Sequence, residues 1–242
     1  MLKVTYLYQD GFLVETKKET MLFNYTFGKM PRIKANKPLY VFVSCHLADY
    51  YNSDVYHLGT DNDNVYYFVA DDAVKNNKMK FRFFYNHILE KQTLENRVQF
   101  VKPDQTYVFG GIKVRTLDCL DGNGSCSFLV YVEDGCIFDA GHMNDWSWPT
   151  EKSDINARAE NGFRKEIMKI RDKHIDVAFV ILNPKQENMY SKGIDYIMRN
   201  CDIDEVYPKH FKDEKKIIDF LLQDPVSEPY RDKIRQTTDY LY

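Results

Sequence analysis

The sequence lacks the short motifs that most often reveal an activity. Its 242 residues contain no Gly-x-Ser-x-Gly elbow, no phosphate-binding loop and no glycine fingerprint for dinucleotides. Nothing therefore points to the chemistries that those motifs support. The formal net charge is only −3, so the sequence gives no sign of the basic surface that a nucleic-acid partner normally requires.

Paired cysteines and long apolar runs are also missing. The five cysteines are odd in number and form no Cys-x-x-Cys motif. The N-terminus, MLKVTYLYQDGF, lacks the basic start and apolar stretch of a signal peptide. No apolar run reaches the length of a transmembrane helix. We therefore expect a cytoplasmic protein with reduced thiols and no membrane partner.

The first half of the chain is rich in short β-type segments separated by turn residues. Gln9-Asp10-Gly11 and Glu133-Asp134-Gly135 are typical of tight turns between antiparallel strands. We expect strands at Lys3–Tyr8, Phe12–Glu15, Met21–Asn24, Val65–Val69, Val98–Val101, Tyr107–Phe109, Ile112–Leu117, Ser127–Val132 and Cys136–Ala140. Residues 71–97 fit either an amphipathic helix or a strand followed by a helix.

The second half becomes helical. Apolar residues recur at spacings of three and four between Ala159 and Ile170, which predicts an amphipathic helix over Ala157–Lys173. The later elements are expected to be a strand, a helix, a strand and a helix, at Val177–Leu182, Tyr190–Arg199, Glu205–Tyr207 and Asp213–Leu222. The pattern indicates an α/β or α+β fold, a single domain over residues 1–242 with a polar tail from about Asp224.

One stretch, Val41–Tyr51, reads VFVSCHLADYY and combines a buried strand with reactive side chains. The apolar run stops at Ser44, and it has the continuous character of a strand buried on both faces. The loop that follows carries Cys45, His46, Asp49 and Tyr50. Binding and catalytic groups favour such loops because a rigid strand positions them.

This stretch resembles the metal-binding signature of the metallo-β-lactamase superfamily, Ser/Thr-His-x-His-x-Asp-His. Ser44 and Asp49 match it, whereas the three histidine positions hold Cys45, Leu47 and Tyr50. His46 occupies a spacer position, so its side chain is expected to point away from a ligand site. The resemblance implies a four-layer αββα sandwich.

Two later segments extend the resemblance. IFDAGHMN, residues 137–144, is similar to the family's Ile-x-His-Ala-Gly-Asp. Here Asp139 stands at the position of the family's histidine, and His142 stands at the position of its aspartate. VYPKHF, residues 206–211, is similar to Val-x-Pro-x-His-Phe, and His210 matches its last metal ligand. The resemblance places Asp49, Tyr50, His142 and His210 around the second of the family's two metal sites.

Two interpretations of these residues stay open. Asp49, His142 and His210 form a two-histidine, one-carboxylate set that suits one zinc or iron ion, with Tyr50 as a weak fourth ligand or hydrogen-bond donor. Alternatively no metal binds, because Leu47 cannot be a ligand and the first site is lost. Asp49 then caps local backbone, and the two histidines are structural.

Two tryptophans, Trp146 and Trp148, follow His142 closely. They either wall a small-molecule pocket or pack beneath the loop as satellite core. Under the first alternative, the resemblance places them at a pocket with Cys45, His46, Tyr50 and Asp139. The sequence does not indicate which small molecule would bind there.

The sequence therefore supports two functions from different classes, and whether the protein is an enzyme stays open. The first is a non-catalytic or weakly active descendant of a metal-dependent hydrolase, a pseudoenzyme that serves as a binding or assembly module. The second is a mononuclear hydrolase that uses Asp49, His142 and His210, with a metal-bound hydroxide as nucleophile. The abundance of aromatic residues is compatible with a homo-oligomer.

Overall fold

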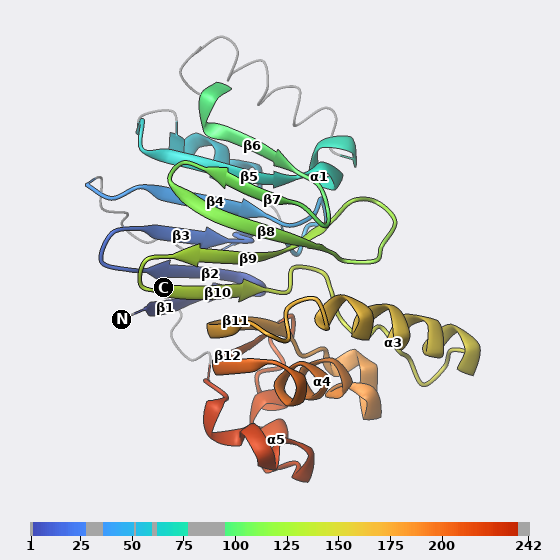
Figure 1. The fold of residues 1–242 in the computed structure, drawn as a ribbon. Coiled ribbons are helices and arrows are strands. Elements are labelled where there is room, and N and C mark those ends of the chain that lie inside the picture. Colours follow the sequence, from blue (N-terminus) through green and yellow to red (C-terminus); the bar gives the residue numbers. More distant parts are fainter. Residues whose placement is uncertain (1, 28–35, 51, 60–61, 77–94, 237–242) are drawn as a thin grey trace.

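Two six-stranded sheets form the centre of the structure (Figure 1). It is a computed structural model that describes residues 2–27, 36–50, 52–59, 62–76 and 95–236. The first sheet has the order β1-β2-β3-β4-β5-β6, with bounds Lys3–Tyr8, Gly11–Glu15, Thr20–Phe23, Leu39–Val43, Val65–Ala70 and Val98–Val101. The first three strands form an antiparallel meander, and β3 to β6 run parallel.

The second sheet has the order β12-β11-β10-β9-β8-β7. In chain order, β7 to β12 span Thr106–Phe109, Ile112–Asp118, Cys126–Val132, Gly135–Asp139, His174–Ile181 and Asp202–Lys209. Strands β7 to β10 are antiparallel neighbours, whereas β10, β11 and β12 run parallel. The residues of the candidate site lie at or just beyond the carboxyl ends of β3, β4, β10 and β12.

Helices flank the two sheets. Beside the second sheet lie α3 (Ser153–Ile167), α4 (Lys192–Asn200), α5 (Lys216–Gln223) and two 3-10 segments, Pro184–Met189 and Pro225–Lys233 (Figure 1). In the first sheet, α1 (Asp71–Asn76) directly follows β5, and a short 3-10 turn, Glu95–Arg97, precedes β6. Another 3-10 segment, Ser53–Gly59, covers the outer face of this sheet. The predicted helix–sheet–sheet–helix arrangement is confirmed.

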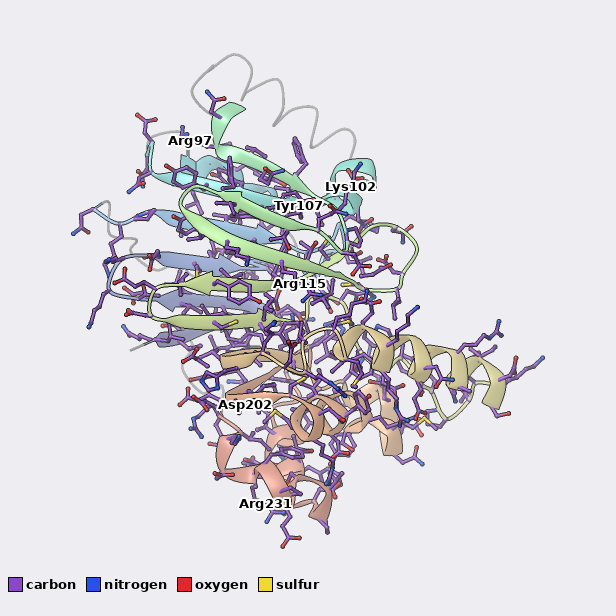
Figure 2. All side chains as sticks on the ribbon, in the orientation of Figure 1. Arg97, Lys102, Tyr107, Arg115, Asp202 and Arg231 are labelled. Atoms are coloured by element: carbon purple, nitrogen blue, oxygen red, sulfur yellow. The ribbon has the colours of Figure 1, made fainter. Side chains whose placement is uncertain are left out.

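Side chains fill the space between the two sheets (Figure 2), and the main core contains many aromatic side chains among aliphatic ones. Phe12 of β2 stacks on Phe179 of β11 with ring centroids 4.0 Å apart. Strand β4 is buried along its whole length, as its sequence predicted. Its side chains alternate between the central core and a second cluster on the outer face of the first sheet. This double burial holds the loop after β4 in place.

The predicted strands are all present in the described residues, and the helix boundaries shift by a few residues. The helix predicted at Ala157–Lys173 begins earlier and ends at Ile167, with turns beyond it. Of the ambiguous region 71–97, the structure describes only α1 and the residues from 95 on. In the polar tail, the 3-10 segment Pro225–Lys233 buries Tyr230. No helix in the described ranges is both long and apolar enough to cross a membrane.

Candidate functional site

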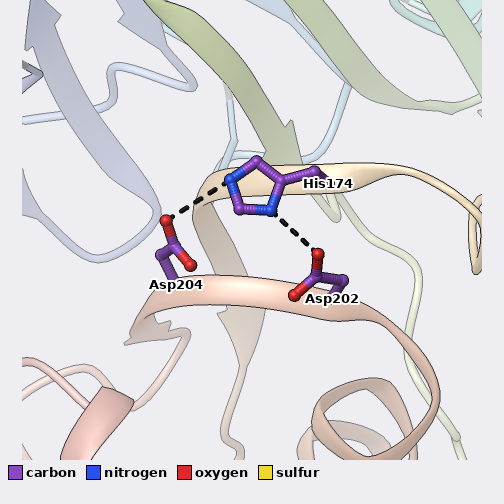
Figure 3. Close-up of side chains that lie close together, drawn as sticks. All are labelled: His174, Asp202 and Asp204. Atoms are coloured by element: carbon purple, nitrogen blue, oxygen red, sulfur yellow. Dashed lines mark hydrogen bonds and ion pairs between the residues drawn. The ribbon is translucent and has the colours of Figure 1, made fainter.

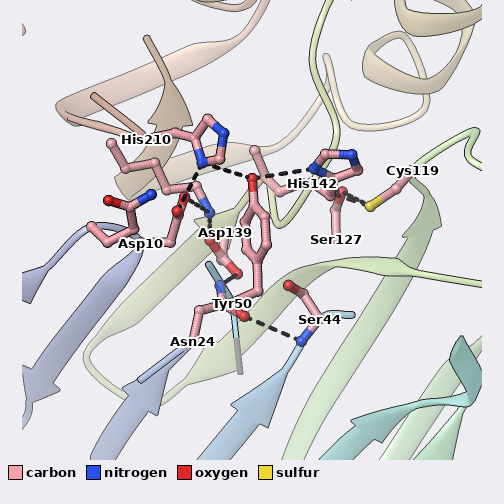
Figure 4. Close-up of polar contacts among 12 residues, drawn as sticks. Asp10, Asn24, Ser44, Tyr50, Cys119, Ser127, Asp139, His142 and His210 are labelled. Atoms are coloured by element: carbon pink, nitrogen blue, oxygen red, sulfur yellow. Dashed lines mark hydrogen bonds and ion pairs between the residues drawn. The ribbon is translucent and has the colours of Figure 1, made fainter. Parts of the chain in front are cut away.

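The candidate site lies between the two sheets, where four parallel strands end (Figure 4). Asn24 and Ser44 directly follow β3 and β4, while Asp139 and Lys209 are the last residues of β10 and β12. All four side chains are fully buried. Hydrogen bonds join the side chains of Asn24, Asp139 and Lys209, and a buried polar group needs such partners. The Ser44 hydroxyl has no hydrogen-bond partner among the described residues.

Asn24 connects the two sheets. Its side-chain Nδ2 donates to Oδ2 of Asp139 at 2.7 Å, and its Oδ1 accepts from the backbone N–H of Ser44 at 3.1 Å. The residue has a φ of 44°, a left-handed conformation that asparagine tolerates better than most residues. Asn24 thus binds the Asp139 carboxylate of the second sheet and the backbone of Ser44 in the first.

Lys209 is the only lysine among the buried polar side chains of the described residues. Its Nζ lies 2.7 Å from Oδ1 of Asp139 and 3.7 Å from Oδ1 of Asp10, whose carboxylate is also fully buried. The ammonium also lies 5.4 Å from the ring centroid of Tyr50. One cation is therefore held between two carboxylates and an aromatic face, which compensates its charge.

Asp10 belongs to the tight turn between β1 and β2 and reaches the end of β12. Its Oδ2 lies 2.9 Å from Nδ1 of His210. The backbone N–H of His210 donates to the carbonyl of Gln9 in the same turn at 3.3 Å. His210 also has a left-handed φ of 68°, which turns its ring back toward this hairpin. The hairpin thereby fixes the orientation of the imidazole.

The hydroxyl of Tyr50 lies between two histidines. It is 3.2 Å from Nδ1 of His210 and 3.3 Å from Nδ1 of His142 (Figure 4). The tyrosine ring is completely buried and stacks on His210 with ring centroids 5.5 Å apart. Burial raises the pKa of the Tyr50 hydroxyl well above its usual value, and it lowers the pKa of His142. A protonated phenol therefore bridges the two rings.

Cys45 and His46 do not join this group. The Cys45 thiol is buried, and burial raises its pKa well above the usual range, so the thiolate needed for metal binding is disfavoured. His46 turns away as predicted: its Nδ1 lies 2.8 Å from Oδ2 of Asp72 in α1. Both residues support the loop after β4 and leave its inner side to Tyr50.

Asp49 also lies apart from the two histidines. Its side chain is 39% exposed, and its Oδ2 is 3.9 Å from Nζ of Lys212. Asp49, His142 and His210 do not form a group whose ligand atoms lie within 4.8 Å of one another, although all three are described. This arrangement does not fit a metal ion at the three residues. The metal set read from the sequence stays a prediction.

Within the described residues, one group does have donor atoms close enough to share a metal ion: His174, Asp202 and Asp204 (Figure 3). Nδ1 of His174 is 2.9 Å from Asp202, and its Nε2 is 3.4 Å from Asp204. These exposed side chains begin β11 and β12, so they lie at the opposite end of the sheet from Lys209. The imidazole of His174 already pairs with the carboxylates of Asp202 and Asp204.

Of the two tryptophans predicted near the site, Trp146 lines a cavity, and Trp148 packs against Trp146. The indole N–H of Trp146 donates to the carbonyl of His142 at 3.0 Å, and its ring stacks on Trp148 with centroids 6.0 Å apart. A cavity of about 580 Å³ is lined by both Trp146 and His142. A smaller cavity of about 100 Å³ is lined by His210 and Asp49. The Tyr50 hydroxyl therefore contacts one histidine of each cavity.

Lys209 and Asp10 were missed by the sequence analysis. Asp10 reads as an ordinary turn residue, so its sequence context carries no functional signal. Lys209 offers a weak one, because a lysine ends a strand whose inward positions are otherwise apolar. Lys209 directly precedes His210 in the sequence, and the histidine is the residue that matches the motif.

Comparison with known proteins identifies the fold and nothing finer. No family model and no curated protein matches the sequence. Solved structures do match. A metallohydrolase from the archaeon Ignicoccus hospitalis is 11% identical with a TM-score of 0.62, over 97% of this chain and 94% of that one. A metallo-β-lactamase fold protein from Bacillus subtilis is 10% identical with a TM-score of 0.54, over 96% and 91%.

The chain has the metallo-β-lactamase fold. A third structure, a candidate metal-dependent hydrolase from Parabacteroides distasonis, agrees at 11% identity and a TM-score of 0.62, over 98% of this chain and 94% of that one. The fold resemblance predicted from the sequence is therefore confirmed over nearly the whole chain. In the metallo-β-lactamase fold of this protein, an ammonium and a phenol occupy the region where Asp139, His142 and His210 converge.

Proposed function

We propose that this protein is a metal-independent binding module with the metallo-β-lactamase fold. The observation that carries the proposal is the buried ammonium of Lys209 between Asp139 and Asp10. A divalent cation near these carboxylates would have to displace Lys209 into an interior that offers it no other counter-charge. Burying an uncompensated ammonium is costly, so the lysine excludes the metal.

The tyrosine supports the same proposal. Metal ligation through Nδ1 of His142 or His210 requires a lone pair directed at the ion, whereas both Nδ1 atoms face the Tyr50 hydroxyl. A completely buried tyrosine cannot leave without opening a cavity of its own. The protein thus keeps the shape of the site, with a phenol between the two histidines.

The binding role follows from the cavity beside His142. Its volume of about 580 Å³ lies within the usual range for small-molecule sites. An indole and several apolar side chains wall it, and a histidine lies at its base. A cavity with mostly apolar walls and few polar groups is typical of ligand binding, and it does not require a reaction.

The proposal is tested by the effect of zinc and of EDTA on the unfolding temperature of the wild-type protein. A metal that binds only the folded state raises this temperature, so a metal-independent fold should respond to neither reagent. The control is His174→Ala, which disrupts the exposed group of His174, Asp202 and Asp204 and removes any adventitious zinc bound there. A zinc-dependent increase that persists in His174→Ala and disappears in His210→Ala would instead establish the mononuclear hydrolase alternative.

A further inference from the structure

The larger cavity combines an apolar wall with very few free polar groups. One wall is a single face of α3, formed by Ile155, Ala159 and Gly162 at helical spacing. Leu120, from the loop after β8, packs against this face at Gly162, where a Cβ would approach its Cδ1 to 3.0 Å. Leu120 and Ile155 are 45% and 38% exposed, unusually open for large apolar side chains. The missing side chain at Gly162 leaves room for Leu120, which completes the apolar wall.

Hydrogen-bond direction determines what His142 presents to the cavity. An ionised Asp10 only accepts, so Nδ1 of His210 carries the proton that the 2.9 Å contact requires. That nitrogen then has no lone pair to accept from Tyr50, and the tyrosine hydroxyl must donate to Nδ1 of His142. The proton of neutral His142 therefore resides on Nε2, which points away from Tyr50 (Figure 4).

Other polar groups around the cavity are already engaged. Asp121 accepts from the backbone N–H of Asn123 and from the Ser125 hydroxyl. The side-chain Nδ2 of Asn144 donates to Gln186 at 2.8 Å. Burial raises the pKa of the Cys119 thiol to about 12, so it stays neutral. In the described part of the chain, Nε2 of His142 has no protein partner. Arg158 adds a second donor at the exposed rim.

We propose that this cavity binds a planar, largely apolar molecule that carries a carbonyl or carboxylate oxygen, with that oxygen accepting from Nε2–H of His142. The inference rests on the proposed metal-independent function, because a metal on His142 would change its hydrogen bonding. Trp146 supplies a flat wall for the ring of the ligand. The contacts from Asp10 through His210 and Tyr50 fix the tautomer of His142. With its proton on Nε2, His142 favours ligands that offer a hydrogen-bond acceptor over ligands that offer a donor.

The test uses two probes of the same shape, acetophenone and α-methylstyrene, in which a C=CH₂ group replaces the carbonyl. The only two tryptophans of the sequence are Trp146 and Trp148, so intrinsic fluorescence reports binding at this wall directly. The dissociation constant of each probe is measured in EDTA for the wild type, His142→Phe and a distant control, His174→Phe. For each protein, the dissociation constant of acetophenone is divided by that of α-methylstyrene. Because the two probes bury the same ring, this ratio removes most of the contribution of ring burial to affinity.

We expect His142→Phe to shift that ratio against acetophenone by about tenfold, the equivalent of one hydrogen bond of roughly 1.4 kcal/mol. His174→Phe should leave it unchanged. A second measurement, ¹⁵N NMR of the His142 ring, should find the proton on Nε2 in the wild type. An unchanged ratio in His142→Phe, no binding of either probe, or a proton on Nδ1 would overturn the inference.

The same preparation separates this inference from the proposed function. If elemental analysis finds a stoichiometric metal that His142→Phe loses, both the metal-independent function and the acceptor site are wrong. If the protein is free of metal and the ratio of probe constants does not change, only the acceptor site is wrong.

Discussion

The Nζ atom of Lys209 lies 2.7 Å from Oδ1 of Asp139, and both side chains are fully buried. The pair joins the ends of β12 and β10 across β11, and Asn24 extends it to the first sheet. A buried ion pair is stable only when its remaining hydrogen-bonding groups are satisfied. Here Asn24 donates to the second oxygen of Asp139, and Asp10 places a second carboxylate 3.7 Å from the ammonium. On the proposed function, this pair takes the place of a metal ion as the central charge of the site.

Lys209→Met should lower the free energy of unfolding by about 3–5 kcal/mol, because it leaves Asp139 and Asp10 buried without a counter-ion. Denaturant unfolding measures the loss. Lys212→Met is the matched control, since Lys212 is half exposed and only 3.9 Å from Asp49; a change within about 0.5 kcal/mol is expected there. Equal effects of the two substitutions would show that Lys209 has no special role.

Zinc should partly restore the stability of Lys209→Met. Removal of the ammonium leaves Asp139, Asp10 and His210 around one vacated volume, and two carboxylates with an imidazole suit zinc. The unfolding temperature of the variant should rise with added zinc, whereas that of the wild type should not. A variant as indifferent to zinc as the wild type would contradict the exclusion of metal by Lys209.

Asn24→Ala should destabilise the protein by more than about 2 kcal/mol. The substitution leaves Oδ2 of Asp139 and the N–H of Ser44 without their partners, and alanine is less tolerant of the φ of 44° at this position. Asn200→Ala, which removes an exposed side-chain bond to the Tyr196 carbonyl, is the control for loss of an asparagine amide. Comparable unfolding midpoints for the two variants would refute the inter-sheet role of Asn24.

Stability should fall as the pH drops below the ordinary histidine value of about 6.5. Burial lowers the pKa of His142 in the folded state, so the unfolded chain takes up that proton first and is favoured through this window. His142→Phe should lack this part of the slope. His174 acts in the opposite sense, because its bond to Asp202 raises its pKa, and it is present in both proteins. Identical pH profiles for wild type and variant would disprove the assignment to His142.

The thiols should be unreactive in the native protein. Burial raises the pKa of Cys45 well above its ordinary value, and it raises that of Cys201, the least buried of the five, to about 11. A thiol reagent at pH 8 should therefore react slowly until denaturant is added. Rapid native modification at Cys45, identified by mass spectrometry, would revive that residue as a thiolate ligand.

Much of the fold was predictable because its signals are local. The uninterrupted apolar run of β4 predicted a strand buried on both faces, and the turn residues predicted the positions of the hairpins. Helix ends were predicted less well: α3 starts at Ser153 without a side-chain cap, so no sequence mark showed where it begins.

The site was only half predictable, for a physical reason. His142, His210 and Tyr50 were recognised from their motifs and do meet, but Asp49 was assigned to the same place and lies beside Lys212. Asp10 and Lys209 are brought together by contacts between distant strands, with 199 residues of sequence separating them (209 − 10). Their pairing depends on the packing of two sheets, which no local pattern records.

The metal content of wild-type protein purified without chelator is the most direct test of the central claim. Elemental analysis should find neither zinc nor iron in near-stoichiometric amounts. The same should hold after incubation with excess zinc and desalting in His174→Ala, which lacks the exposed group of His174, Asp202 and Asp204. About one zinc or iron per chain, retained in His174→Ala and lost in His210→Ala, would contradict the account and show that a metal displaces Lys209 or Tyr50.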